Sequence, residues 1–138
     1  MPVTQDEAQS ILGAAEAKAK EIGVRLTLVV TDEAGFLIAL RRMDGASRVS
    51  TEVTPAMAYT AAAFRRSGPE LMRLQDAPFF KAWSNMHGGG MFIGEGAFPL
   101  MRDGQMLGVV ATGGGQEEQD REAAKAGADA FEALARVK

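Results

Sequence analysis

The apolar residues near the start of the chain recur with the period of a helix. Between residues 8 and 22 they lie three or four positions apart, which places them on one face of a helix. Thr4 and Glu7 have the spacing of a capping box, in which each side chain accepts a hydrogen bond from the other residue's backbone amide. Gly23 is a typical residue just beyond a helix end. The pattern predicts an amphipathic helix that stops at Gly23.

Two runs with the composition of β-strands follow this helix. Arg25 to Thr31 is almost continuously apolar at its centre, and Phe36 to Arg42 forms the second run. The residues between them end in Gly35 and have the composition of a turn, so the two runs predict a β-hairpin. Because its apolar residues are continuous rather than alternating, the first strand is expected to be covered on both faces.

The middle of the chain combines a clear helix with a segment of weak pattern. Residues 50–66 are predicted to be helical, with Pro55 in the first turn, where its missing N–H costs little. A short helix is expected over residues 69–74. The aromatic stretch 79–83 shows no regular pattern, and the glycine-rich residues 86–96 predict a loop that leads into a strand.

A second hairpin and a final helix complete the pattern. Phe98 to Arg102 and Gln105 to Thr112 flank Asp103-Gly104, a dipeptide with a strong preference for two-residue hairpin turns. After Gly113 to Gly115, an amphipathic helix is predicted from Gln116 onward. Helices and hairpins therefore alternate along the chain, which favours an antiparallel sheet covered by helices.

Together the predicted elements form one α+β domain over residues 1–138, with a central antiparallel β-sheet flanked by helices. A hydrophobic content of 46% is enough for one core and argues against disorder. The net charge of −3 and the scattered basic residues argue against nucleic-acid binding, which needs clustered positive charge. The absence of cysteine excludes disulfides and thiolate ligands.

No targeting or membrane segment is recognisable in the sequence. No apolar stretch reaches the roughly 20 residues that span a bilayer. The first residues are polar and acidic, which is atypical of a secretory signal. We therefore expect a cytoplasmic protein with no membrane partner.

Several ordered motifs are spread over residues 4–135. They are Val29 to Gly35, Arg42 to Ala46, Thr60 to Arg66, Phe98 to Leu100, Gly108, Gly113-Gly114 and Glu118 to Asp120. In this order the motifs resemble the GlcG/HbpS-like family of haem-binding or haem-degrading proteins, and a similar domain is found fused to cobalamin adenosyltransferases. The resemblance implies a profilin-like fold, homo-oligomers from tetramers to octamers, and haem or a related tetrapyrrole as a ligand.

At two places the sequence departs from the family pattern. Met57 takes the place of a lysine, which removes a charge able to pair with an anionic ligand. Ser84 to Gly90 contains an inserted Met-His pair where the family reads Ser-Asn-Gly-Gly, which adds a titratable group. Both departures indicate a specialised pocket.

His87 is the only histidine, so any imidazole chemistry depends on it. An imidazole has an ordinary pKa of about 6.5, which suits proton transfer near neutral pH, and it is able to ligate haem iron. Glu95 is a candidate carboxylate partner for proton transfer. The alternative is a loop histidine with structural hydrogen bonds alone. Apart from haem iron held by His87, one histidine and scattered acids predict no metal site.

Three side chains and two glycine clusters are candidates for ligand binding. Arg42 is able to hold a carboxylate through two hydrogen bonds, with Asp44 orienting its guanidinium, and Tyr59 offers the only phenol. The glycine candidates are Gly89, Gly90, Gly113 and Gly114; the last two precede a predicted helix, whose free amides favour an anion. The structural alternatives are a surface ion pair, a core tyrosine and tight turns. Arg65-Arg66, at a helix end, is assigned to the helix dipole.

These candidates leave three functions open. The first is a cytoplasmic small-molecule-binding protein that takes haem or a related tetrapyrrole in an oligomer, with His87 as iron ligand. The second is an isomerase, lyase or hydrolase in which His87 transfers protons and Arg42 holds a carboxylated substrate. The third is an oligomeric accessory protein that stabilises a partner enzyme. Haem binding predicts an absorption band that changes when His87 is removed, and the enzyme predicts a pH dependence set by His87. The accessory function predicts that His87→Ala leaves every property except partner binding intact.

Overall fold

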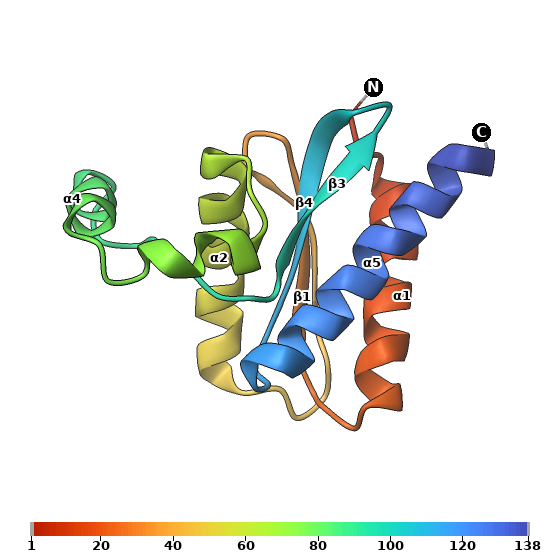
Figure 1. Cartoon of the computed structure of the whole chain (residues 1–138). Helices are drawn as coiled ribbons and strands as arrows, with labels where there is room; N and C mark the ends of the chain where they lie inside the picture. The colour runs from red at the N-terminus through yellow and green to blue at the C-terminus, as the bar shows by residue number, and fades with distance from the viewer. Residues whose placement is uncertain (1, 138) are drawn as a thin grey trace.

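A four-stranded antiparallel β-sheet forms the centre of the molecule (Figure 1). The computed structural model describes residues 2–137, with side chains as far as Leu134. The strands are β1 (Thr27–Asp32), β2 (Leu37–Arg42), β3 (Ala97–Arg102) and β4 (Gln105–Gly113). Their order is β2-β1-β4-β3, so β1 and β4 are central and β2 and β3 are edges. Both predicted hairpins and the α+β architecture are confirmed.

Helices cover both faces of this sheet (Figure 1). The covering helices are α1 (Gln5–Glu21), α2 (Arg48–Phe64) and α5 (Glu117–Val137). Helices α1 and α5 lie side by side on one face, and α2 lies alone on the other. We call the sheet and these three helices the body. No helix described within residues 2–137 has the length and apolar composition needed to cross a membrane.

The body contains two apolar cores, one on each face of the sheet. Ile11 and Phe131 belong to the core under α1 and α5, and neither side chain is exposed to solvent. Met57 and Val109 belong to the core under α2. Strand β1 lies between the two cores and is buried over its first five residues, as its continuous apolar run predicts.

Helix α1 begins with the predicted capping box. The Thr4 hydroxyl accepts a hydrogen bond from the Glu7 amide at 3.0 Å, and the Glu7 carboxylate accepts one from the Thr4 amide at 2.9 Å. The second carboxylate oxygen of Glu7 forms an ion pair with Arg102 of β3. The Arg102 guanidinium in turn lies 4.7 Å from the centre of the Phe131 ring on α5. These contacts hold the start of α1 against β3 and α5.

Helix α2 begins earlier than the sequence pattern predicts. The Ser47 hydroxyl accepts a hydrogen bond from the Ser50 amide at 3.2 Å, and this cap starts the helix at Arg48. The placement of Pro55 in the first turn is therefore wrong, because the capping serine lies further upstream and Pro55 falls inside the helix. At the other end, Arg65 adopts a left-handed conformation with a φ of 56°.

Residues 68–96 form a projection that we call the α4 arm (Figure 1). Its elements are α3 (Gly68–Leu71), the short 3-10 helix η1 (Met72–Leu74) and α4 (Pro78–Met86). Leu71, Phe80 and Ile93 are buried together in a cluster separate from the two cores of the body. The helix α4 corrects the prediction of an irregular aromatic stretch. Its start lacks a side-chain cap, which leaves Pro78 in the first turn as the start signal.

Candidate functional site

His87 lies at the C-terminal end of α4 and is exposed to solvent. The amides of His87 and Gly89 both donate to the Ser84 carbonyl, at 2.9 and 2.8 Å, and these bonds close the end of the helix. The centre of the imidazole ring lies 4.8 Å from that of Trp83 and 6.3 Å from that of Tyr59 on α2. The structure therefore brings together two predicted site residues, His87 and Tyr59, and adds Trp83 between α4 and α2.

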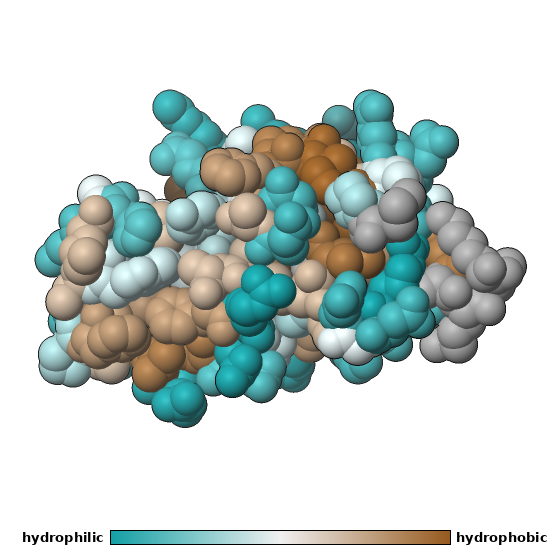
Figure 2. Space-filling view, turned by 90° about the horizontal axis from the view of Figure 1, so that it is seen from above, coloured by the Kyte–Doolittle hydropathy of each residue, from teal (hydrophilic) through white to brown (hydrophobic). Residues whose placement is uncertain are grey.

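The ring contacts continue from Trp83 along the arm. Phe64, at the end of α2, lies 5.0 Å from Trp83 and 6.3 Å from Phe79, measured between ring centres. We call Tyr59, Phe64, Phe79, Trp83 and His87 the aromatic face. Figure 2 shows apolar surface on the side of the molecule from which α4 projects.

Three large apolar side chains of the arm are left in contact with solvent. Met86 is 82% exposed, Phe79 60% and Phe92 40%. A soluble monomer rarely leaves a contiguous apolar area of this kind uncovered. The arm therefore has the composition of a surface that receives a ligand or a partner.

The glycines after His87 leave open space beside the imidazole. Gly88 and Gly89 have φ values of +78° and +79°, in the left-handed region that favours glycine. A Cβ atom at Gly88, Gly89 or Gly90 would meet no atom within 4 Å. The predicted ligand role of Gly89 and Gly90 stays a prediction, and the geometry leaves their backbone accessible.

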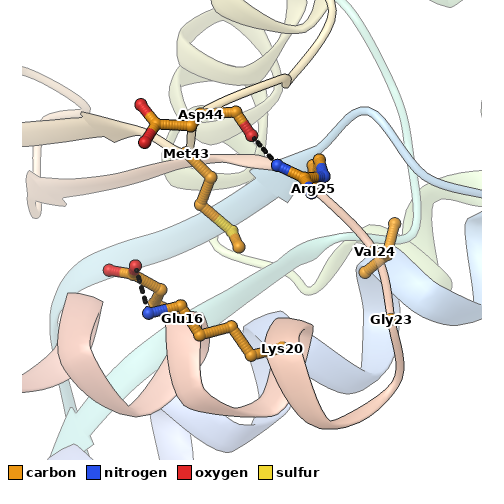
Figure 3. Close-up of a pocket in the computed structure, with 7 residues that line it drawn as sticks. All are labelled: Glu16, Lys20, Gly23, Val24, Arg25, Met43 and Asp44. Atoms are coloured by element: carbon orange, nitrogen blue, oxygen red, sulfur yellow. Dashed lines mark hydrogen bonds and ion pairs between the residues drawn. The ribbon is translucent and has the colours of Figure 1, made fainter.

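Arg42 is the last residue of β2, and Asp44 lies in the loop between β2 and α2. The Arg42 guanidinium donates two hydrogen bonds to the Ala46 carbonyl, at 3.3 and 2.9 Å, and so closes the β2–α2 loop. Asp44 lines a hollow of about 350 Å³ together with Arg25, Lys20 and others (Figure 3). Arg25, whose guanidinium donates to the Asp44 carbonyl at 2.8 Å, is the arginine that faces this hollow.

The hollow in Figure 3 is lined by one large apolar side chain and several charged side chains. The Met43 thioether extends into it from the β2–α2 loop. On the α1 side, the Glu16 carboxylate is shared by Lys20 at 3.2 Å and Arg41 at 2.8 Å. These ion pairs hold the pKa of Glu16 below its ordinary value, with the hydrogen bond from Arg41 as the largest cause. The charges of Glu16, Lys20 and Arg41 on this side of the hollow thus largely neutralise one another.

Gly113 and Gly114 allow the end of β4 to approach α2 closely. A Cβ atom at Gly113 would lie 2.3 Å from the Thr54 hydroxyl oxygen. Gly114 has a φ of +117°, and its Cβ atom would lie 3.1 Å from the Ser50 side chain. Close packing against α2 therefore accounts for both glycines, and anion binding by this turn stays a prediction.

Glu95 and Asp120 occupy the junction between the arm and the start of α5. The Glu95 carboxylate, the predicted partner of His87, forms an ion pair with Arg121. Asp120 is only 4% exposed, and its carboxylate accepts a hydrogen bond from the Gly115 amide at 2.9 Å. Burial raises the pKa of Asp120 to about 7, and the nearby Glu117 adds to the shift, while the Gly115 hydrogen bond opposes it.

Comparison with known proteins places the chain in a family. The model of the family described as haem-degrading protein HbpS-like matches residues 3–129. The chain belongs to the HbpS-like family. This confirms the resemblance carried by its sequence motifs.

The HbpS-like chain also resembles individual proteins along most of its length. It is 31% identical to an uncharacterised 15.0 kDa protein of the dhaT–dhaS intergenic region of Citrobacter freundii, over 96% of this chain and 94% of that protein. Its fold matches Klebsiella pneumoniae protein ORFY with a TM-score of 0.86 and 27% identity, over 94% of this chain and 90% of that one. It matches PduOC in a complex with haem with a TM-score of 0.85 and 26% identity, over 94% and 95%.

In this HbpS-like chain, the predicted site residues fall into separate places. His87 and Tyr59 meet on the aromatic face, whereas Arg42 and Asp44 lie at the end of β2 and in the loop that follows it. Trp83 and Asp120 were not selected from the sequence. The four-residue spacing of Trp83 and His87 would indicate their contact only once α4 is known to be a helix. Within residues 2–137, no group of three or more histidines and acids is placed to hold a metal ion.

Proposed function

We propose that this chain binds haem or a related tetrapyrrole at the aromatic face, with the His87 imidazole as iron ligand. The observation that carries the proposal is an exposed imidazole beside the Trp83 ring, at the end of a series of aromatic side chains. Two comparisons support it: the family is described as haem-degrading, and the similar PduOC structure is a complex with haem.

The residues of the aromatic face fit the chemistry of a haem group. Haem is a flat apolar ring system whose iron takes an axial ligand such as histidine. Trp83 and Tyr59 pack against the imidazole and would hold its orientation. The glycines that follow His87 put no side chain in the way of a large planar ligand. When bound, haem supplies an iron centre, and the residues of this chain bind and orient it.

The same surface supports assembly into a homo-oligomer, for which we propose a tetramer to an octamer. Met86 and Phe79 expose apolar surface on the subunit, which is typical of an interaction site. A site between subunits would cover these side chains and enclose the second face of the haem. Sedimentation velocity measures the size of the assembly directly.

Titration of the purified protein with haemin tests the proposal. The wild-type protein is expected to give a saturable shift of the Soret band, and His87→Ala is expected to lose it. Asn85→Ala is the matched control, because Asn85 is exposed on the same helix and has no ring contact. Trp83→Leu is expected to weaken haemin binding while keeping the spectrum of histidine ligation. An identical shift in wild type and His87→Ala would contradict ligation by His87.

The acid–base alternative has weaker support from the geometry. Glu95 is paired with Arg121, and Arg42 is bonded to the Ala46 carbonyl. Neither group is therefore placed as the partner of His87 that the enzyme hypothesis requires. A haem-free protein that turns over a carboxylated substrate with a pH profile set by His87 would restore this alternative.

A further inference from the structure

A second hollow lies at the opposite end of the body from Asp44, where α2 ends beside the β3–β4 hairpin. Its volume is about 600 Å³, which is within the range of about 300–1,000 Å³ typical of small-molecule sites. Arg65 and Arg66 form one side, and Pro99, Met101, Gln105 and Met106 of the hairpin form the other. Figure 2 looks onto this end of the molecule and shows hydrophilic side chains standing beside apolar surface.

The positive charge in this hollow is only partly balanced within the protein. No acidic residue lines it. Within residues 2–137, the Arg65 guanidinium has no hydrogen-bond or ion-pair partner, and Arg66 donates only to the Arg65 carbonyl, at 3.0 Å. The carboxylate of Glu70 accepts hydrogen bonds from Ser67 in the cap of α3 and lines a neighbouring hollow together with Arg66. The hydrogen bonds from Ser67 lower the pKa of Glu70, and the charge of Arg66 adds to this effect. Arg65 is thus available to an anion from solution, and Arg66, which forms no ion pair with Glu70, is able to join it.

The backbone at Arg65 supports a role for its side chain. Its φ of 56° is left-handed, a conformation that usually selects glycine just after a helix. An arginine is disfavoured there relative to glycine, so the end of α2 alone does not account for it. The helix dipole is stabilised by any cation in the last turn, so it does not specify an arginine at position 65.

The apolar side of the hollow restricts the kind of anion. Met101 and Pro99 lie on the edge strand β3, and Met106 is almost fully buried next to them on β4. Inorganic phosphate would leave these groups uncovered, whereas an alkyl chain would cover them and lose contact with water. Methionine side chains adapt readily to apolar ligands of different shape.

We propose that this hollow binds an amphiphilic organic anion, a carboxylate carried on an unbranched apolar chain. Arg65 and Arg66 hold the carboxylate through charge-assisted hydrogen bonds. The chain lies on Pro99, Met101 and Met106, and the Gln105 amide lies at the rim. This site contains no residue of the aromatic face, so it is independent of haem binding.

Calorimetric titration with octanoate tests the proposal. The wild-type protein is expected to bind octanoate saturably, and Arg65→Gln and Arg66→Gln are each expected to weaken binding by about tenfold, the typical effect of losing a charged hydrogen bond. Arg73→Gln is the matched control, because Arg73 lines the neighbouring hollow and does not line this one. Thermal midpoints equal to that of the wild type would show that none of the three substitutions disturbs the fold. Haemin binding is expected to be unchanged in Arg65→Gln.

Two further ligands separate the contributions of head group and chain. Octylammonium keeps the chain and reverses the charge, and acetate keeps the carboxylate and removes the chain; both are expected to bind at least about tenfold more weakly than octanoate. Octanoate affinity that is equal in wild type and Arg65→Gln would overturn the proposal. Equal binding of octylammonium, equal binding of acetate, or the absence of saturable octanoate binding would also overturn it.

Discussion

The body and the α4 arm differ in where their apolar residues lie. In the body, β1 and the inner sides of the helices on both faces are buried. Among the side chains of the body that the structure describes, large apolar ones are exposed only at the start of α2 and along β2 with the residue before it, namely Val49, Phe36, Leu37 and Leu40. In the arm, three residues form the buried cluster, while Phe79 and Met86 remain exposed. Apolar burial is the main source of stability, so the body supplies the fold and the arm keeps apolar surface available for binding.

The largest expected difference between the two regions is the cost of removing one phenylalanine. Phe131→Ala removes a fully buried ring that also contacts Arg102, and is expected to lower the free energy of unfolding by about 3–5 kcal/mol. Phe79→Ala removes a ring that is 60% exposed and is expected to cost less than about 1 kcal/mol. Urea unfolding of both variants measures the difference. Equal losses would show that the arm is part of the same cooperative core.

A smaller effect is expected from the buried carboxyl of Asp120. Its pKa is raised to about 7 in the folded protein, against about 3.9 in an unfolded chain. Between these values the folded state binds more protons at this carboxyl, so the contribution of Asp120 to stability is greatest at acid pH and falls as pH rises toward 7. The slope contributed by this one group is at most about 1.4 kcal/mol per pH unit. It is expected to level off above pH 7.

Asp120→Asn removes this dependence while keeping an oxygen that accepts the Gly115 hydrogen bond. The variant is therefore expected to be more stable than wild type at pH 8 and to differ less at pH 4. Thermal unfolding across this range provides the measurement. Asp129→Asn, which changes an exposed aspartate of the same helix, is the control and should keep the wild-type slope. An unchanged slope in Asp120→Asn would show that another group causes it.

The smallest effect on stability is expected for a charge placed on the arm. Phe79→Lys should leave the free energy of unfolding of the subunit within about 1 kcal/mol of wild type. If the aromatic face is covered by another subunit, the same substitution should shift the protein to smaller species in sedimentation velocity, because a buried unpaired charge is costly. An unchanged assembly would place the interface elsewhere on the molecule.

The sequence predicts the body better than the arm because the signals of the body are local. Thr4 and Glu7 cap α1 as their spacing indicates, and Asp103-Gly104 turns the second hairpin. Helix α4 has no capping side chain, and much of its apolar surface faces solvent instead of one buried side. The signal that remains at its start is Pro78 in the first turn, which is weaker than a capping side chain.

The candidate site was predictable only in part, for the same physical reason. His87 stands out as the only histidine, but its contact with Tyr59 depends on the docking of α4 against α2. Arg25 rather than Arg42 faces the hollow near Asp44, because Arg42 donates to the Ala46 carbonyl and Arg25 to the Asp44 carbonyl. The spacing of these residues in the sequence does not predict these hydrogen bonds. The raised pKa of Asp120 comes from burial, which follows from the packing of the whole junction.

The position of Trp83 gives the protein an internal optical reporter. The chain has one tryptophan and one tyrosine, and both belong to the aromatic face. Intrinsic fluorescence excited near the red edge of absorption therefore originates in the arm, while far-ultraviolet circular dichroism follows the helices of the body. A single unlabelled sample can thus report separately on ligand capture and on the integrity of the fold.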